Sequence, residues 1–319
     1  MICSSPMNEA VLIRLHSLGD VVLAQPVATR LSESAKVNFV TSERYLPVVE
    51  RMPGDIEAFP YPPDAGPFEL RRILRNMSPG ILIDLQCNFT TRMATKGMRV
   101  SGRFRMNRKL RHEILGGSSD IMPLRSSEFL SFAGASDDID PVLERRNVSS
   151  DDRLRVGIVV GGRWRLKSIP DSVISELSRL FIDLYDAEVI LLGDEKDRAE
   201  AFETAKSVGR DSIKACAGDG GTGELIERIE TMDLLISPDS GPAHLAKALG
   251  IPVLVVFTST SPALGFWRQE YSGNYMVSGL QCRPCHRHGG KTCPTGTEMC
   301  RRGLVPHRMV TKAMEMLQT

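Results

Sequence analysis

The chain has 319 residues, of which 42% are hydrophobic, and its formal net charge at pH 7 is +1. The length suits one large or two ordinary domains, and the near-neutral charge excludes a general nucleic-acid binder, which needs a sustained positive field. Seven cysteines are too few and too unevenly placed for a secreted disulfide scaffold. Residues 1–6 lack signal-peptide features, and the longest apolar run, 251–257, is far shorter than the roughly 20 residues that span a bilayer. We therefore expect a cytoplasmic protein.

Strand-like runs and helical patterns alternate through the first half of the chain. Helical spacing covers 21–31, 45–52 and 69–77, and Pro26 predicts a kink or a short first turn in the first of these helices. Such alternation is typical of right-handed βαβ crossovers and a parallel sheet. The strand candidates are 11–15, 36–40, 56–59 and 81–85.

A polar, acidic stretch at 134–152 reads as a linker, and the alternation restarts after it. We expect an N-terminal Rossmann-like domain over 1–152, with its linker from about 135, and a C-terminal one over 153–319. Ligands of such sheets bind at the carboxyl ends of the strands, so two facing units create a cleft. The second-half elements are strands at 156–160, 189–192, 213–216, 234–236 and 253–257, and helices at 171–185, 197–208, 223–232 and 244–249.

Two strand-to-helix junctions concentrate polar groups. Residues 234–246 read as a buried strand, a tight turn and a helix start, where unpaired backbone N–H groups favour an anion. At this junction Asp239 is suited to capping the helix or holding ligand hydroxyls, and His244 either lines a pocket or packs. The anion-facing candidates are Ser240, Gly241 and Ala243, with Pro242 near the first helical position.

The second junction follows strand 11–15, where the turn Ser17-Leu18-Gly19-Asp20 delivers a carboxylate to the mouth of the sheet. Together with Asp84-Leu85-Gln86, Lys167, Leu192-Gly193-Asp194 and Asp239-Ser240-Gly241-Pro242-Ala243-His244, this order resembles glycosyltransferase family 9. The best-known members are the ADP-heptose:lipopolysaccharide heptosyltransferases. The resemblance runs from about Val11 to Val310. It implies an α/β GT-B fold with the acceptor bound mainly by the N-terminal domain and the nucleotide-sugar by the C-terminal domain.

The resemblance assigns roles to individual residues. Asp20 is the expected general base, since an inverting sugar transfer needs a carboxylate to take the acceptor proton; a plain helix N-cap is the alternative. Lys167 is expected to bind the donor diphosphate rather than being a solvated surface lysine. Asp197 can accept hydrogen bonds from ribose hydroxyls, or it can be an acidic first-turn residue; Asp194 and Glu195 are alternatives. Gly19 is placed with the acceptor.

A basic segment lies between 92 and 111, with eight Lys or Arg residues and no acidic residue. Such a cluster binds acidic sugars, phosphates or an anionic leaflet, or it is a solvated face. We expect it to contact an anionic lipopolysaccharide core and the inner face of the plasma membrane. The acceptor candidates are Arg92, Lys96, Arg103, Arg105 and Arg108.

The tail contains a C-x2-C-x7-C-x6-C pattern. Its first pair has metal-ligand spacing, and four thiolates suit a structural zinc that ties down a loop-rich segment; free thiols are the alternative. The members are Cys282, Cys285, Cys293 and Cys300.

The sequence thus predicts an inverting GT-B transferase that moves a heptose from ADP-heptose to the lipopolysaccharide inner core. No cofactor is expected for catalysis, because a lysine and helix dipoles can neutralise the leaving group. A family 9 enzyme with another donor or acceptor, or a non-catalytic nucleotide-sugar-binding protein, stays open. A nicotinamide-dependent dehydrogenase is disfavoured because the first turn lacks G-x-G-x-x-G. The acceptor, the sugar stereochemistry and the oligomeric state are left undetermined. Where the family often has Gly-Pro-Thr-Asp-Pro, residues 258–262 read Thr-Ser-Thr-Ser-Pro, which leaves the sugar and base contacts open.

Overall fold

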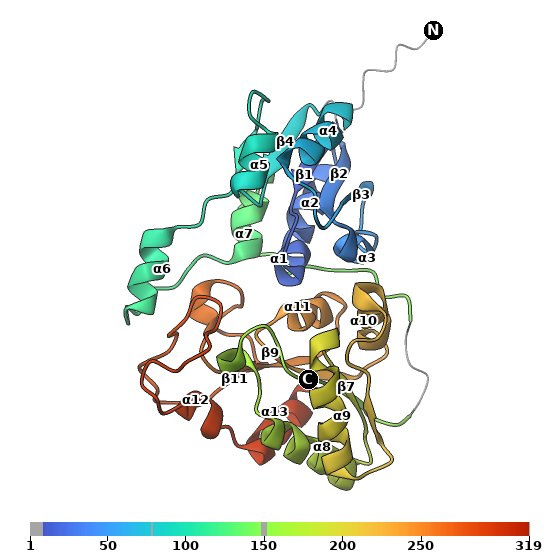
Figure 1. The fold of residues 1–319 in the computed structure, drawn as a ribbon, viewed down its shortest axis with the longest axis vertical. Helices are drawn as coiled ribbons and strands as arrows, with labels where there is room; N and C mark the ends of the chain where they lie inside the picture. Colours follow the sequence, from blue (N-terminus) through green and yellow to red (C-terminus); the bar gives the residue numbers. More distant parts are fainter. Residues whose placement is uncertain (1–8, 78, 148–151, 319) are drawn as a thin grey trace. The chain divides into compact units, whose positions relative to one another are not determined.

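The computed structural model describes residues 9–77, 79–147 and 152–318. The chain divides into two compact units, and each is discontinuous in sequence (Figure 1). The first comprises Met1–Met106 and Leu124–Glu144, and the second Asn107–Pro123 and Arg145–Thr319. Residues 1–6, which the signal-peptide prediction concerned, and 148–151 of the expected linker lie outside the described residues. None of the described helices is long and apolar enough to cross a bilayer.

The first unit is built on a parallel sheet in the order β3-β2-β1-β4-β5. The central strand β1 pairs on both sides, so that Val11 lies beside Asn38 of β2 and Leu82 of β4. The strands are β1 (Glu9–Ile13), β2 (Lys36–Ser42), β3 (Ile56–Tyr61), β4 (Ile81–Asp84) and β5 (Gly102–Arg103). The helices are α1 (Leu18–Leu23), α2 (Gln25–Ser32), α3 (Leu46–Val49), α4 (Pro67–Met77), α5 (Phe89–Ala94) and α7 (Arg125–Leu130), with 3-10 turns at η1 (Glu43–Tyr45) and η2 (Ser131–Ala133).

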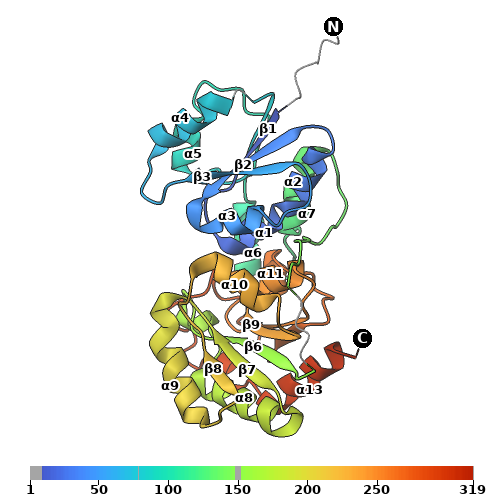
Figure 2. The ribbon, with the colours of Figure 1, turned by 90° about the vertical axis from the view of Figure 1, so that its right-hand side faces the viewer.

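The second unit repeats the design with a parallel sheet in the order β11-β10-β9-β6-β7-β8 (Figure 2). Its strands are β6 (Arg155–Val159), β7 (Glu188–Leu192), β8 (Ile213–Ala215), β9 (Leu234–Pro238), β10 (Val253–Phe257) and β11 (Asn274–Met276). Its helices are α6 (Arg108–Leu115), α8 (Asp171–Tyr185), α9 (Arg198–Val208), α10 (Gly221–Ile229), α11 (Gly241–Ala248), α12 (Met299–Arg302) and α13 (Pro306–Met316), with 3-10 turns η3 (Arg165–Lys167), η4 (Glu195–Asp197) and η5 (Pro262–Leu264).

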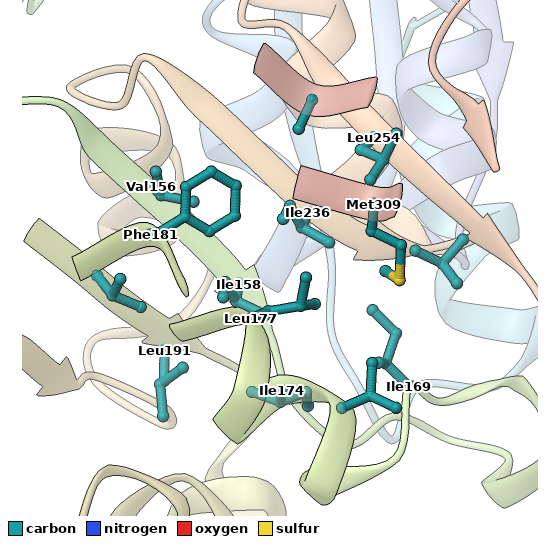
Figure 3. Close-up of a cluster of buried hydrophobic side chains, with 14 of the residues drawn as sticks. Val156, Ile158, Ile169, Ile174, Leu177, Phe181, Leu191, Ile236, Leu254 and Met309 are labelled. Carbon is teal, nitrogen blue, oxygen red and sulfur yellow. The ribbon is translucent and has the colours of Figure 1, made fainter. Parts of the chain in front are cut away.

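The core of the second unit lies between its sheet and the helices α8 and α13. Ile158 of β6 and Ile236 of β9 meet Leu177 and Phe181 of α8 and Met309 of α13, all of them fully buried (Figure 3). Burying such a side chain stabilises the fold by about 1.5–3 kcal/mol each. In the first unit the corresponding core lies under α4 and α5, and includes Val11, Ile13, Leu70, Leu74 and Leu82.

The predicted alternation of strands and helices is confirmed, and the first helix breaks where proline predicts. The helical pattern of 21–31 appears as α1 and α2, which meet at Ala24, and Pro26 is the second residue of α2. Its missing N–H costs nothing there, because first-turn N–H groups have no partner within the helix. The expected helix 45–52 shortens to α3, preceded by η1.

One segment of the N-terminal half belongs to the second unit. Residues 107–123, which carry α6, pack near η5, where the N–H of Met122 donates to the carbonyl of Ala263 at 2.9 Å. A Cβ on Gly265 would lie 2.3 Å from the carbonyl oxygen of Pro123, so this glycine permits the close approach of the two segments. A single boundary near residue 152 therefore does not describe how the chain divides.

Candidate functional site

In the second unit, the loops that carry the predicted donor residues follow neighbouring strands. Adjacent strands β6 and β9 are the point where the strand order reverses, and ligands of α/β sheets bind outside the carboxyl ends of strands at such a point. The loop after β6 leads to Lys167, the loop after β9 carries Asp239, and the loop after β10 carries Thr260. The structure thus brings these residues to one edge of one sheet.

Lys167 and Asp239 form an ion pair at this edge. The Nζ of Lys167 lies 3.1 Å from Oδ2 of Asp239, and their side chains are 22% and 6% exposed. The same carboxylate accepts hydrogen bonds from the hydroxyl of Thr260 at 2.9 Å and the indole N–H of Trp267 at 3.1 Å. Asp239 therefore fixes the ammonium group of Lys167 at the mouth of the sheet.

The prediction that Asp239 caps the following helix is wrong. Ser240 is the N-cap residue of α11 and makes no side-chain cap hydrogen bond. Asp239 instead points to three donors from elsewhere in the unit. Burial opposes its charged form, but the charges of Lys167 and His244 and the hydrogen bonds from Lys167 and Thr260 outweigh burial and lower the pKa of Asp239.

The first turn of α11 keeps the composition that the sequence predicts for an anion site. Gly241 and Pro242 are the first two helical residues, and Ala243 follows. The hydroxyl of Ser240 lies 3.0 Å from the hydroxyl of Ser237, which steadies the turn. Backbone N–H groups of this turn have no partner within the helix, so they suit an oxyanion.

His244 is buried and belongs to an aromatic stack that the sequence did not reveal. Its ring stacks on Trp267 with centroids 4.6 Å apart, and Trp267 stacks on Tyr271 at 5.5 Å. The Nζ of Lys247 lies over the rings of both Trp267 and Tyr271, 4.6 Å from the centroid of the Tyr271 ring. The stack fixes the indole whose N–H binds Asp239, so Trp267 and Thr260 are site residues that sequence reasoning missed. The only signal for Thr260 was the unusual 258–262 segment.

Asp197 is the last residue of η4, which follows β7, and its carboxylate oxygens accept hydrogen bonds from the backbone. They accept the N–H of Asp194 at 3.0 Å and the N–H of Gly162 at 3.3 Å. Gly161 must be a glycine here, because its φ is +61° and a Cβ would lie 2.2 Å from Oδ1 of Asp197. Asp197 therefore joins the loop after β6 to the loop after β7, and any ribose contact uses its remaining lone pairs.

Asp171, Asp197 and Glu200 form a cluster of carboxylates beside this glycine loop. Burial, a hydrogen bond and the charge of Asp171, together with the charge of Asp197, raise the pKa of Glu200 to about 7. The backbone of Gly161 bonds to Glu200 and partly offsets this rise. No pattern in the sequence linked the two carboxylates, because Asp171 begins α8 and Glu200 lies in α9.

In the first unit the strand order reverses between β1 and β4. Asp20 follows the turn after β1, beside this point of reversal. Asp20 lies in the first turn of α1 and is not its N-cap, which is Ser17. Its carboxylate pairs with the guanidinium of Arg14 at 2.5 Å and lies 4.0 Å from that of Arg125. Two nearby cations favour the ionised carboxylate.

Both arginines are themselves held firmly. Arg125 is 4% exposed, with its guanidinium 4.5 Å from the ring centroid of Phe104, and Arg14 lies 5.9 Å from that of Phe129. Nη1 of Arg14 also donates to the carbonyl of Leu85 at 2.9 Å. Arg125 comes from α7, and no pattern in the sequence linked it to Asp20.

The turn after β4 supports the turn after β1. The side-chain oxygen of Gln86 accepts the backbone N–H groups of Leu15 at 3.1 Å and His16 at 3.2 Å. Gln86 is held by Asp84, a fully buried residue whose Oδ1 accepts its N–H at 3.1 Å. Ser17 adopts φ +75°, a conformation that costs a non-glycine residue about 1–3 kcal/mol and persists only when its surroundings enforce it.

The basic segment is divided between the two units. Arg92 on α5 and Lys96 just after this helix are exposed in the first unit, whereas Arg108 lies on α6 in the second unit. The side chain of Arg103 makes contacts within the fold. Its guanidinium pairs with Asp84 at 3.0 Å and donates to the hydroxyl of Thr95 at 2.6 Å. Arg105 is exposed. The predicted acceptor residues thus come from both units, and their contact with an acceptor stays a prediction.

The predicted zinc site is not formed. Burial and the neighbouring thiols of Cys300, Cys282 and Cys293 raise the pKa of Cys285 to about 11. Across residues 9–77, 79–147 and 152–318, however, no three His, Cys, Asp or Glu side chains converge on a metal-sized point. The segment braces η3 instead, because Glu298 binds both Arg165 and Arg301.

Comparison with known proteins assigns the chain to a family. The model of glycosyltransferase family 9 (heptosyltransferase) matches residues 134–297, slightly more than half of the chain. Lipooligosaccharide heptosyltransferase 2 of Campylobacter jejuni subsp. jejuni serotype O:2 is 31% identical over 99 residues, which are 30% of this chain and 28% of that protein. The matched stretch thus spans less than a third of the curated relative.

Solved structures share the fold over nearly the whole chain. The ADP-heptose lps heptosyltransferase II of E. coli superposes with a TM-score of 0.75 at 17% identity, covering 98% of this chain and 99% of that one. A family 9 glycosyl transferase from Veillonella parvula DSM 2008 gives 0.77 at 16% identity, covering 98% and 97%. These likenesses identify the two-sheet α/β fold as GT-B, as the sequence predicts. Because the family model matches more than half of the chain, the chain belongs to glycosyltransferase family 9.

Proposed function

We propose that the protein is an inverting glycosyltransferase that moves a heptose from ADP-heptose to an anionic acceptor of the lipopolysaccharide inner core. The observation that carries the proposal is the pair of switch-point sites: a carboxylate held by two arginines in the first unit, and a fixed lysine beside a helix N-terminus in the second. One site offers a base and the other a diphosphate site, which are the two requirements of the reaction. Family membership and the heptosyltransferase relatives support the choice of donor.

Asp20 is the proposed base. An acceptor hydroxyl oxygen attacks the anomeric carbon opposite the departing diphosphate, a new carbon–oxygen bond forms, and the proton passes to the carboxylate of Asp20. Arg14 and Arg125 keep that carboxylate ionised and fix its direction. Their charges also limit its basicity, so proton transfer occurs late, as the hydroxyl becomes acidic in the transition state.

The departing ADP gains negative charge as the bond to the sugar breaks. Lys167 and the backbone N–H groups of Ser240, Gly241 and Ala243 at the start of α11 are the proposed groups that stabilise this charge. Asp239 is a positioning residue in this scheme, because it holds the ammonium group of Lys167 in place. Asp197 and His244 are proposed to line the nucleotide-sugar side of the site, and Gly19, Arg92, Lys96, Arg105 and Arg108 are proposed for the acceptor, with Arg103 supporting them.

The test is Asp20→Asn, with Asp64→Asn in an exposed loop of the same unit as the matched control. We expect Asp20→Asn to lower transfer at least 100-fold, about the lower limit for general-base catalysis, and to leave ADP affinity unchanged by calorimetry. Asp64→Asn should behave as the wild type. Near-normal turnover by Asp20→Asn would exclude Asp20 as the base.

A panel of nucleotide-sugars, scored by protection against thermal unfolding, tests the donor. Protection by ADP-heptose above that by ADP alone supports the proposal. Stronger protection by another nucleotide-sugar would make this a family 9 enzyme with a different donor. Donor binding without any turnover by the wild type would favour a non-catalytic binding protein. The proposed setting is the cytoplasmic side of the membrane that carries the acceptor.

A further inference from the structure

The helices α4 and α5 of the first unit expose aromatic side chains among cations. Phe68 of α4 is 84% exposed and Phe89 of α5 is 75% exposed, the two largest values among the exposed large apolar side chains described. Met93, one turn after Phe89, is 42% exposed. Solvent exposure of two phenylalanines on adjacent helices costs free energy that a solvated face has no reason to bear.

Helical geometry places these side chains away from the core. On α4, Leu70, Leu74 and Met77 are buried against the sheet, and Phe68 projects to the opposite face. On α5, Thr91 and Ala94 are buried, and Phe89 and Met93 share the outer face at i and i+4. Each helix therefore has an inner face that packs and an outer face that begins with phenylalanine.

The two outer faces lie together. Views at right angles show α4 and α5 as neighbours (Figures 1 and 2), and Nη1 of Arg71 on α4 donates to the carbonyls of Ala94 at 2.9 Å and Lys96 at 2.6 Å. Both helices return from one parallel strand to the next, α4 from β3 to β4 and α5 from β4 to β5. They therefore run the same way, with Phe68 and Phe89 toward the sheet edge that carries Gln86 and Asp20.

The charge of this surface is strongly positive. Between residues 67 and 99 there are six Lys or Arg residues against two acidic ones. Of the two acids, Asp84 is buried in its ion pair with Arg103, and Glu69 is bonded by Arg72. The exposed cations near the phenylalanines include Arg75, Arg92 and Lys96.

We propose that the outer faces of α4 and α5 dock on the headgroups of an anionic bilayer, with Phe68, Phe89 and Met93 inserted at the interface. Aromatic side chains surrounded by cations match this partner, because the rings gain an apolar surrounding while the cations meet lipid phosphates. The surface borders the edge that holds Asp20, so docking would present a lipid-anchored acceptor to that edge. This functional consequence rests on the proposed reaction, whereas the docking itself does not.

The experiment measures co-sedimentation of the full chain with vesicles of phosphatidylcholine alone or of phosphatidylcholine and phosphatidylglycerol in equal parts. We expect binding only to the mixed vesicles, falling as salt is added. Phe68→Ser with Phe89→Ser should lower the partition coefficient at least about 10-fold. Arg75→Gln, Arg92→Gln and Lys96→Gln together should lower it on the order of 100-fold, about 5-fold for each cation.

The matched control is Phe202→Ser on α9, where the side chain is 60% exposed in the second unit. It should bind mixed vesicles as the wild type does. A second readout uses Phe89→Trp and Phe202→Trp with brominated lipids: quenching above that of the native tryptophans is expected for Phe89→Trp only. No sugar nucleotide is present, so these assays can succeed or fail whatever Asp20→Asn shows.

Three results would overturn the proposal. The first is equal binding to both vesicle types by the wild type. The second is unchanged vesicle binding by the phenylalanine variant together with no added quenching of Phe89→Trp. The third is a change in oligomeric state, without a change in vesicle binding, when Phe68 and Phe89 are replaced, because that result would make this face a contact between copies of the chain.

Discussion

Replacing Lys167 should expose how strongly the donor site depends on its ion pair. Lys167→Met removes the cation 3.1 Å from a carboxylate that is only 6% exposed. Breaking a buried pair costs about 3–5 kcal/mol, because it leaves the other charge uncompensated. Thr260 and Trp267 still donate to Asp239, and Lys167 is 22% exposed, so we expect a loss of about 2–4 kcal/mol in the free energy of unfolding.

The assay is a double-mutant cycle by urea unfolding of Lys167→Met, Asp239→Asn and the double variant. Removing both charges eliminates the uncompensated carboxylate, so the double variant should lose at least about 1 kcal/mol less than the sum of the singles. Additive losses, within about 0.5 kcal/mol, would refute the pairing as a source of stability.

The same cycle has a defined pH dependence. The folded pKa of Asp239 is lowered, so its contribution to stability is present above its unfolded pKa of about 4 and is lost as the pH falls through the folded value. Lys167→Met weakens that preference for the charged form. Its cost should therefore be greatest near neutral pH and should fade below about pH 4. A cost that is constant from neutral to acidic pH would contradict this account.

Three further predictions address other parts of the two units. Gln86→Leu should lower kcat about 10-fold with donor affinity unchanged, because the turn that leads to Asp20 loses two hydrogen bonds. Exposed Gln269→Leu is the control and should have no effect. An unchanged kcat in Gln86→Leu would show that Gln86 does not support Asp20. Glu200 has a folded pKa of about 7 against about 4.5 unfolded, so its contribution is fully present below the unfolded value and lost as pH rises through the folded one. Glu200→Gln should therefore gain about 1 kcal/mol over the wild type between about pH 5 and pH 8 in thermal or urea unfolding, whereas Glu203→Gln should not, and parallel pH profiles would contradict the assignment. Arg103→Gln should lower the free energy of unfolding by about 2–4 kcal/mol, because it leaves the buried carboxylate of Asp84 without its ion-pair partner. Exposed Arg105→Gln should leave stability unchanged while raising the acceptor KM. The reverse pattern in unfolding and kinetics would show that the two roles are exchanged.

The sequence by itself determined the architecture and predicted where candidate site residues lie. Buried parallel strands are short apolar runs, so those of β1, β2, β9 and β10 are visible without a structure, and the polar residues that follow them mark the carboxyl edges of the sheets. Asp20 and Lys167 were predicted as site residues because each follows such a strand and belongs to a family motif. The break between α1 and α2 at Ala24 was predictable because Pro26 restricts the backbone of its own segment.

Only the tertiary structure decided which partners these residues have. Asp239 looked like a helix cap because a carboxylate before a helix usually caps it, yet its partners Thr260 and Trp267 lie 21 and 28 residues away in sequence. Gln86 supports His16 across 70 residues, and Arg125 approaches Asp20 from a helix that no local pattern linked to it. The division of 92–111 between the two units was hidden for the same reason, since α6 packs in the second unit. Periodicity and turn chemistry are set by neighbours along the chain, whereas the choice among distant hydrogen-bond and ion-pair partners is fixed only when packing excludes water and brings separate segments together.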